Sequence, residues 1–310
     1  MGEEQSKSVG ASVLTVDLGA TMLADLDLLL TAVFATADDL LPWRRGNARR
    51  SVTDAEVVTL AVAQAIMDIA SDREFLIVAA KRLRHLFPKL PQQRGYWKRR
   101  LRLAEQVEWL TAMFAQDSPG YYDDVVLLDS TPVECGRSVD TARRSALAPA
   151  CAHHYSRSHS RWFWGMRLHL LAAPDGTPRA AILASADQKS ATSPCACLTS
   201  DCAAASWSSV TRAMPAATSN RPRPSATARG SCVPRARTNP AAARSSAGSD
   251  NESSRSSTRS KDRLGLERHR ARSLHGLRAR IATKLLALAA GVWLNHYLNR
   301  PTRAFAALAA

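Results

Sequence analysis

The clearest strand signal in the chain is Val125-Val126-Leu127-Leu128-Asp129-Ser130-Thr131-Pro132-Val133-Glu134. It begins with consecutive apolar residues, and the carboxylate of Asp129 follows them directly. A short Val- and Leu-rich run of this kind is typical of a strand that is buried on both faces of a sheet. We expect the strand to cover residues 123–130. Asp129 then lies at the strand end, where a rigid element can hold a functional carboxylate.

Two more strands are expected downstream of this stretch. Residues 162–171 alternate apolar with polar side chains, and Asp175-Gly176 supplies the turn into a third strand over residues 179–184. A strand followed by a hairpin opens many mixed α/β sheets. Arg167 and His169 fall on the polar side of the second strand, which is typical of a solvent-facing position.

The segment between the first two expected strands is polar and rich in histidine, and it is interpreted as a loop. It contains His153, His154, Arg157 and His159, which are candidates for contacts with DNA phosphates. Polar side chains on a surface loop are the more ordinary explanation.

Residues 18–118 predict a helical domain, and residues 1–17 predict a flexible tail. Apolar residues recur at helical spacing from Leu18 to Ala37. Thr53 and Glu56 form a capping-box pattern that opens a helix through about Ile66. The same pattern at Ser71 opens a helix through about Leu86, and residues 102–114 predict another. About four helices are therefore expected.

Basic residues concentrate near the end of this helical domain. Residues 81–102 contain nine Lys or Arg and no acid, with Tyr96 and Trp97 among them. Successive short helices of this kind suit a helix-turn-helix-like DNA contact. A helical cap on the next domain, with solvated basic residues, is an equal alternative. The candidate DNA-binding residues are Arg44, Arg45, Arg49, Arg50, Lys98, Arg99, Arg100 and Arg102.

The formal charge of +15 is unevenly distributed along the chain. Residues 191–260 carry +6 and residues 261–310 carry +8, so the rest is nearly neutral. A basic excess favours a polyanionic partner, of which nucleic acid is the commonest. For residues 191–260 a solvated basic segment is the preferred interpretation.

Residues 191–260 differ in composition from the segments on either side. They contain sixteen serines and six prolines but no Ile, Phe, Tyr or Lys, so they cannot bury enough surface to offset the entropy of ordering. A disordered or degenerate segment is predicted. Its cysteines match no usual zinc-binding spacing. Helical periodicity returns from Leu264 to Leu298, as one long helix or two joined ones.

The expected location is the cytoplasm, with reduced thiols and no membrane partner. Residues 1–10 are too polar for a signal peptide. The longest apolar run, Leu285 to Leu294, is too short to cross a bilayer.

Three separated blocks in this order resemble the bacterial insertion-sequence transposases of the DDE type. They are the helical domain, the pair of runs LLDSTPV (127–133) and WFWGMRLHL (162–170), and the block from Lys261 onwards. The resemblance implies an α+β protein: an N-terminal helical domain followed by an RNase H-like mixed sheet with helices. Residues 119–190 then form the first half of the catalytic domain, and residues 261–310 form its C-terminal helices.

The resemblance also implies a mechanism, partners and a metal. Three carboxylates hold two Mg²⁺ or Mn²⁺ ions that promote cleavage and transfer of DNA strands by in-line phosphoryl displacement. Asp129 matches the first carboxylate and is the expected catalytic and metal-binding residue. The partner is double-stranded DNA at the ends of the element and at the target. A homodimer is expected by analogy, because two DNA ends must be joined.

The other two carboxylates depart from the family's pattern, so the sheet is expected to be incomplete. The second belongs on a fourth strand. Asp201 follows no apolar run that could form one, and Asp187 is so close to the third strand that it belongs to the loop after it. The third belongs to the pattern Tyr-x2-Arg-x3-Glu-x6-Lys. Counting back from Lys261 places Ser254 at the glutamate position. Glu252 is the nearest acid, but two residues on a helix rotate a side chain by about 200°, away from the metals.

One hypothesis covers these departures: residues 190–260 are translated out of frame, and the frame is restored before Lys261. A natural disordered insertion is the rival reading. The chain is then either a DDE transposase, inactive for lack of ligands, or a non-catalytic DNA-binding remnant. A third possibility is an Arg/Ser-rich nucleic-acid module formed by residues 191–260 themselves. Poor solubility is also expected, because an incomplete sheet leaves an edge exposed.

Overall fold

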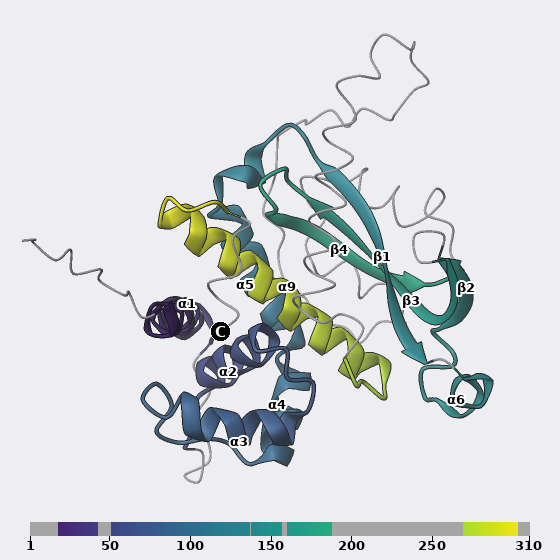
Figure 1. Ribbon diagram of the computed structural model, residues 1–310, viewed down its shortest axis with the longest axis horizontal. Coiled ribbons are helices and arrows are strands. Elements are labelled where there is room, and N and C mark those ends of the chain that lie inside the picture. The colour runs from purple at the N-terminus through teal and green to yellow at the C-terminus, as the bar shows by residue number, and fades with distance from the viewer. Residues whose placement is uncertain (1–17, 43–50, 137, 157–159, 188–268, 303–310) are drawn as a thin grey trace, which may run out of the picture.

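The computed structural model describes residues 18–42, 51–136, 138–156, 160–187 and 269–302. The chain forms helices first, then antiparallel strands, and returns to a long helix (Figure 1). The α+β class expected from the sequence is confirmed. The helices of the first part are α1 (Leu18–Leu40), α2 (Asp54–Ile66), α3 (Asp72–Arg82), α4 (Gln93–Arg102) and α5 (Ala104–Gln116).

The starts of α2 and α3 follow the capping signals in the sequence. At α2, the Thr53 hydroxyl accepts the backbone N–H of Glu56, and the Glu56 carboxylate accepts the backbone N–H of Thr53, which completes the capping box. At α3, the Ser71 hydroxyl accepts the backbone N–H of Glu74 at 3.4 Å. The helix ends at Arg82, earlier than the predicted Leu86, because the backbone at Leu83 leaves the helical conformation.

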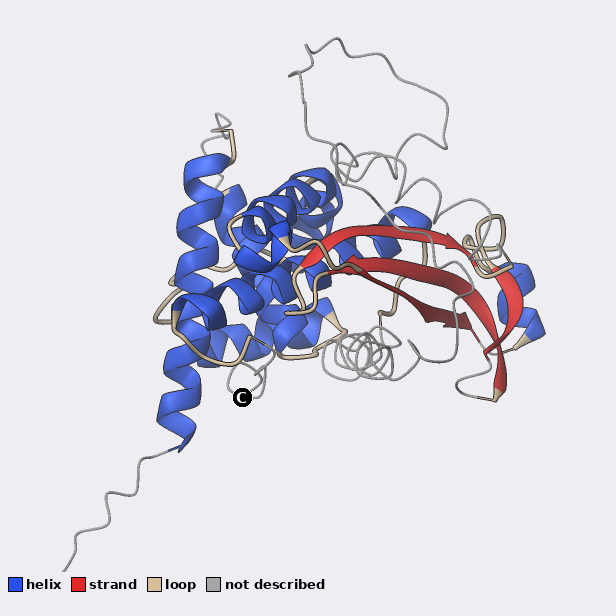
Figure 2. Ribbon diagram, turned by 90° about the horizontal axis from the view of Figure 1, so that it is seen from above, coloured by secondary structure: helices blue, strands red, loops and turns tan. Residues whose placement is uncertain are grey.

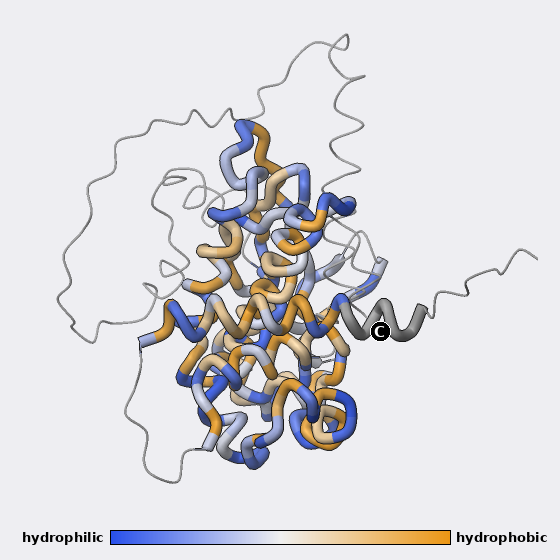
Figure 3. Tube along the Cα trace, turned by 90° about the vertical axis from the view of Figure 1, so that its left-hand side faces the viewer, coloured by the Kyte–Doolittle hydropathy of each residue, from blue (hydrophilic) through white to orange (hydrophobic). Residues whose placement is uncertain are grey.

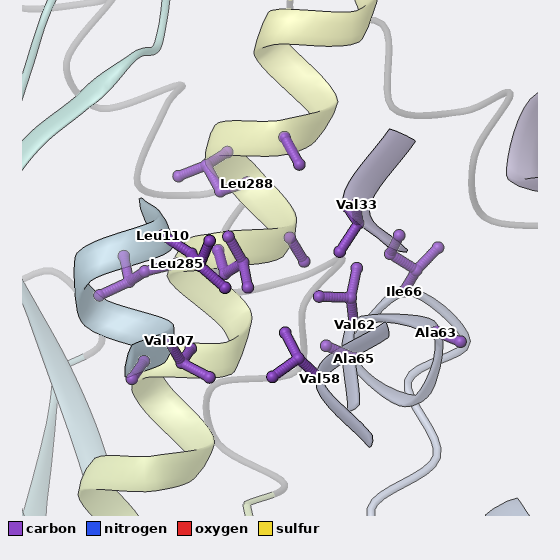
Figure 4. Close-up of a cluster of buried hydrophobic side chains, with 14 of the residues drawn as sticks. Val33, Val58, Val62, Ala63, Ala65, Ile66, Val107, Leu110, Leu285 and Leu288 are labelled. Atoms are coloured by element: carbon purple, nitrogen blue, oxygen red, sulfur yellow. The ribbon is translucent and has the colours of Figure 1, made fainter. Parts of the chain in front are cut away.

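The helix α9 (Leu274–Tyr297) is the element around which the other helices pack. It contacts α1, α2, α4 and α5 on the helical side and β4 of the sheet. Figure 4 shows Val33 of α1, Val58 and Val62 of α2, and Leu110 of α5 converging on Leu285 and Leu288 of α9. One hydrophobic core therefore joins segments that lie far apart in the sequence.

The sheet has four strands in the described part, and every pairing is antiparallel. The strands are β1 (Leu127–Gly136), β2 (Ala152–Ser156), β3 (Arg161–Ala172) and β4 (Pro178–Ser185). The central strand is β3: β1 pairs along one side of it, and β4 and β2 pair with its two ends on the other side. The sheet forms a curved layer with the helices gathered toward one end (Figure 2).

One face of the sheet packs onto the helices. Met166, Leu168 and Leu170 of β3 are buried in the same core cluster as the residues of α5 and α9. A short 3-10 helix, Pro119–Tyr122, connects α5 to β1, and α6 (Val139–Arg144) follows β1. In Figure 3 the helices alternate between hydrophobic and hydrophilic colours along their length, as expected for helices with one buried face.

Three expectations about the sheet are wrong. The first strand does not end at Ser130 but continues through Pro132 to Gly136, so Asp129 is its third residue. Proline is tolerated there because β1 pairs with β3 alone among the described strands, and an edge strand needs fewer backbone donors. The expected His-rich loop contains β2, which includes His153 and His154. The sheet that the structure describes is antiparallel, not mixed.

Gly165 allows the close approach of β1 and β3. A Cβ atom at this position would overlap the carbonyl oxygen of Val133. The pairing register shifts beside it, between Glu134 and Gly136, which is where Cys135 forms an irregularity in the ladder. A side chain at Gly165 would therefore force β1 and β3 apart.

None of the helices in the described part of the chain has the length and apolar character needed to cross a membrane.

Candidate functional site

The helix α4 presents a line of cations on its exposed face. Arg94, Lys98 and Arg102 are exposed and four residues apart, so they lie on one side of the helix. Each step along this line is a rise of about 6 Å. We call these three residues the α4 basic stripe. Trp97 lies beside them with 47% of its surface exposed.

The opposite face of α4 is buried, and it includes Arg100. The Arg100 Nη1 donates to Oε1 of Gln64 at 2.7 Å and to Oδ1 of Asp72 at 2.8 Å. Its guanidinium lies 5.2 Å from the centre of the Tyr96 ring, and the Tyr96 hydroxyl donates to the same Gln64 oxygen. Burial raises the pKa of the Tyr96 hydroxyl far above its usual value.

Arg99 also has partners within the protein. Its Nε donates to Asp54 at 3.0 Å and its Nη1 to the backbone oxygen of Val52 at 2.8 Å. Its side chain is 12% exposed. Of the α4 residues predicted to bind DNA, Lys98 and Arg102 face outward, whereas Arg99 and Arg100 connect α4 to α2 and α3. The structure therefore separates two exposed cations from two that have partners inside the protein.

The carboxylate of Asp129 lies on β1, opposite Leu170 of β3. The residue is half-buried, and the hydroxyl of Thr131 approaches its Oδ2 at 3.5 Å. Because β1 pairs only with β3 in the described part, Asp129 lies on an edge strand. The strand therefore holds the carboxylate rigidly near the margin of the sheet.

His169, opposite Ser130 in the neighbouring strand, is not on a solvent-facing side of its strand, contrary to the expectation. It is fully buried, and neither ring nitrogen has a hydrogen-bond partner among the described residues. Burial lowers the pKa of His169, the charge of Arg167 lowers it further, and the carboxylate of Asp129 acts in the opposite direction. The imidazole is therefore neutral at pH 7.

The residues that the structure describes do not form a metal site. No three of the His, Cys, Asp and Glu side chains in the described ranges lie together in a way that could hold a metal ion. Of the predicted ligands, Asp129 alone is described. A two-metal centre needs several oxygen ligands, so the described donors do not fit one.

Several predicted residues lie outside the described residues. They are Arg44, Arg45, Arg49 and Arg50 before α2, and Glu252, Ser254 and Asp201 in the later segment.

Sequence reasoning missed a buried group of polar residues that joins α2, α3, α4 and α9. Asp72 receives hydrogen bonds from Gln64, Arg100 and Arg280. The available signal was the presence of Arg278, Arg280 and Lys284 in a helix that is otherwise strongly apolar. Charged side chains in such a helix are expected to have buried partners. Arg278 has one in Glu108 of α5, with two donors at 2.8 Å.

Comparison of the chain with protein-family models, with curated proteins and with solved structures found no match.

Proposed function

We propose that this chain is a DNA-binding protein descended from the DDE transposases of insertion sequences, with an incomplete set of metal ligands. The observation that carries the DNA-binding function is the α4 basic stripe. Its three cations lie on the outward face of a helix, and the opposite face is fixed by buried contacts. A rigid helix with aligned cations suits the regularly spaced phosphates of a duplex.

The proposed descent rests on the resemblance of the runs at 127–133 and 162–170 to this family of transposases. The arrangement of the strands is compatible with that descent. The strands β1, β3 and β4 lie side by side, and Asp129 is on the edge strand. In the family, the strand that carries the second carboxylate would come after the equivalent of β4. It would pair with the side of β1 that has no partner among the described strands, and so bring that carboxylate beside Asp129. The described residues contain no such strand, and the sequence offers no apolar run for one.

Removing the outward charges of α4 should weaken DNA binding. We expect the double substitution Lys98→Gln with Arg102→Gln to reduce affinity for duplex DNA. Each lost phosphate contact lowers the slope of log K against log salt by about 1, so the slope should fall by about 2. Fluorescence anisotropy with a labelled duplex, from 50 to 200 mM salt, measures both quantities.

The matched control is Arg143→Gln with Arg144→Gln, which removes the same charge from exposed positions on α6. Figure 1 places α6 beside β2, away from α4. If the slope of log K against log salt fell equally in the two double variants, DNA binding would depend on the total charge of the protein and not on the α4 basic stripe.

The incomplete ligand set predicts that the chain does not cleave DNA. We expect wild type and Asp129→Ala to give the same background of plasmid nicking with either Mg²⁺ or Mn²⁺, because one carboxylate cannot hold two metals. The plasmid should carry candidate element ends. Nicking by wild type that disappears in Asp129→Ala would contradict the inactive assignment. The chain would then be an active DDE transposase, and Glu252 would be the next candidate catalytic residue to replace.

A further inference from the structure

A pocket with basic walls lies where α2, α4 and α9 meet the turn that follows α2. The pocket is partly open to solvent, and its cavity volume is about 30 Å³. The polar side chains that line it are Gln64, Asp68, Arg100, His269, Arg280 and Lys284. The DNA-binding function proposed above uses none of these side chains.

The carboxylate behind the pocket is already fully engaged. Oδ1 of Asp72 accepts hydrogen bonds from Gln64 at 3.0 Å, from Arg100 at 2.8 Å and from Arg280 at 3.1 Å. The second terminal nitrogen of Arg280 donates to the backbone oxygen of Ala70 at 2.9 Å. By contrast, the buried Nε–H of Arg100 has no hydrogen-bond acceptor among the residues that the structure describes. A buried donor of this kind is costly unless a ligand satisfies it.

His269 contributes no charge to the pocket. The backbone N–H of Ala271 donates to its Nδ1 at 3.0 Å, so Nδ1 carries no proton. The Nε2–H then donates to the backbone oxygen of Glu134, also at 3.0 Å. Burial lowers the pKa of His269, which agrees with a neutral ring.

The remaining charges leave the pocket positive. Arg100, Arg280 and Lys284 face two carboxylates, those of Asp68 and Asp72. Burial lowers the pKa of Lys284 to about 8, the charges of Arg280 and Arg100 act in the same direction, and Asp68 opposes them. Burial and Arg100 also lower the pKa of Arg280. Cations that lower one another's pKa lie where an anion would be stabilised.

We propose that this pocket binds a single tetrahedral oxyanion of the phosphate or sulfate class, held by Arg100, Arg280 and Lys284. Three cations and two carboxylates leave about one net positive charge, which suits one small anion and not a polyphosphate chain. The Nε–H of Arg100 would gain an acceptor, and the anion would also interact with the ammonium of Lys284.

Thermal unfolding of the full chain in sodium sulfate and in sodium chloride, at equal ionic strength and pH 7.5, tests this site. Sulfate at about ten times its Kd should raise Tm by roughly 3 °C above the chloride value. Lys284→Met keeps the length of the side chain and removes its charge, so the sulfate-specific rise should disappear. Lys81→Met, at an exposed position on α3, should keep it. Equal Tm values for wild type in the two salts would overturn the assignment.

A pH series on wild type gives a second readout that needs no variant. Lys284 is protonated below its pKa of about 8, so sulfate affinity should be full at pH 7 and fall as the pH rises through 8 to 9. Sulfate does not titrate in this range. The charged and titratable groups that line the pocket with Lys284 are Asp68, Arg100, His269 and Arg280, and Asp72 is hydrogen-bonded to the two arginines. An affinity that stays constant from pH 7 to 9.5 would contradict a role for Lys284.

The oxyanion could be free in solution or the terminal phosphate of a nucleic acid, and two duplexes distinguish these sources. A duplex with a 5′-phosphate should compete with sulfate better than one with a 5′-hydroxyl if the ligand is a DNA end. Equal competition by both duplexes identifies the free anion. The sulfate measurements contain no DNA, so loss of the DNA-binding function would leave them unchanged.

Discussion

Replacing Asp72 with alanine should lower the free energy of unfolding by about 3–5 kcal/mol, because it leaves buried cations without their counter-charge. Arg100 and Arg280 both donate to this carboxylate, and the side chains of Asp72 and Arg100 are each 8% exposed. Burial of that extent gives water little opportunity to replace the lost partner. Denaturant unfolding followed by circular dichroism measures the change.

The control for this substitution is Glu74→Ala on the same helix. Glu74 is exposed, so removing its carboxylate should cost under about 1 kcal/mol. A loss for Asp72→Ala as small as that for Glu74→Ala would mean that the buried hydrogen bonds around Asp72 contribute little to stability.

Replacing Leu286 with alanine should cost about 2–5 kcal/mol, since it removes a fully buried side chain from the helix that unites the core. The cost within this range depends on how far the surrounding helices can move to fill the cavity left by the removed side chain. Leu28→Ala on α1 makes the same chemical change at a position that is 45% exposed, and it should cost under 1 kcal/mol. Comparable midpoints of denaturation for the two variants would show that α9 is not tightly packed.

Local sequence signals predicted the elements whose structure depends on near neighbours. The Thr53 capping box opens α2 as expected, and the Asp175-Gly176 turn joins β3 to β4. Gly176 adopts a φ of 99°, a conformation that glycine reaches without strain. These features are specified by residues within a few positions of one another, so a single sequence is sufficient to find them.

Features that depend on distant partners could not be predicted in the same way. Lys98 and Arg100 are two positions apart on one helix, yet one faces outward and the other is buried. The difference arises from Asp72 and Gln64, whose positions relative to α4 are set by packing. Likewise, the first strand was expected to end at Ser130, whereas the edge position of β1 allows it to continue through Pro132.

The candidate carboxylate site was predicted only in part. Asp129 was found from its apolar run, but its place within β1 and its position opposite Leu170 depend on pairing with β3. His169 was assigned to the solvent side because alternation along a strand does not reveal whether the second face is covered. The histidine is in fact fully buried.

The central position of α9 has a consequence for how the chain folds during synthesis. The helix α2 ends at Ile66 and α9 begins at Leu274, so 207 residues separate two elements that share one core. At roughly 5–20 residues per second, α2 leaves the ribosome about 10–40 s before α9 is synthesised. During that interval the apolar faces of α1, α2 and α5 are available to chaperones and to other nascent chains. The yield of folded protein should therefore depend on translation speed and chaperone supply.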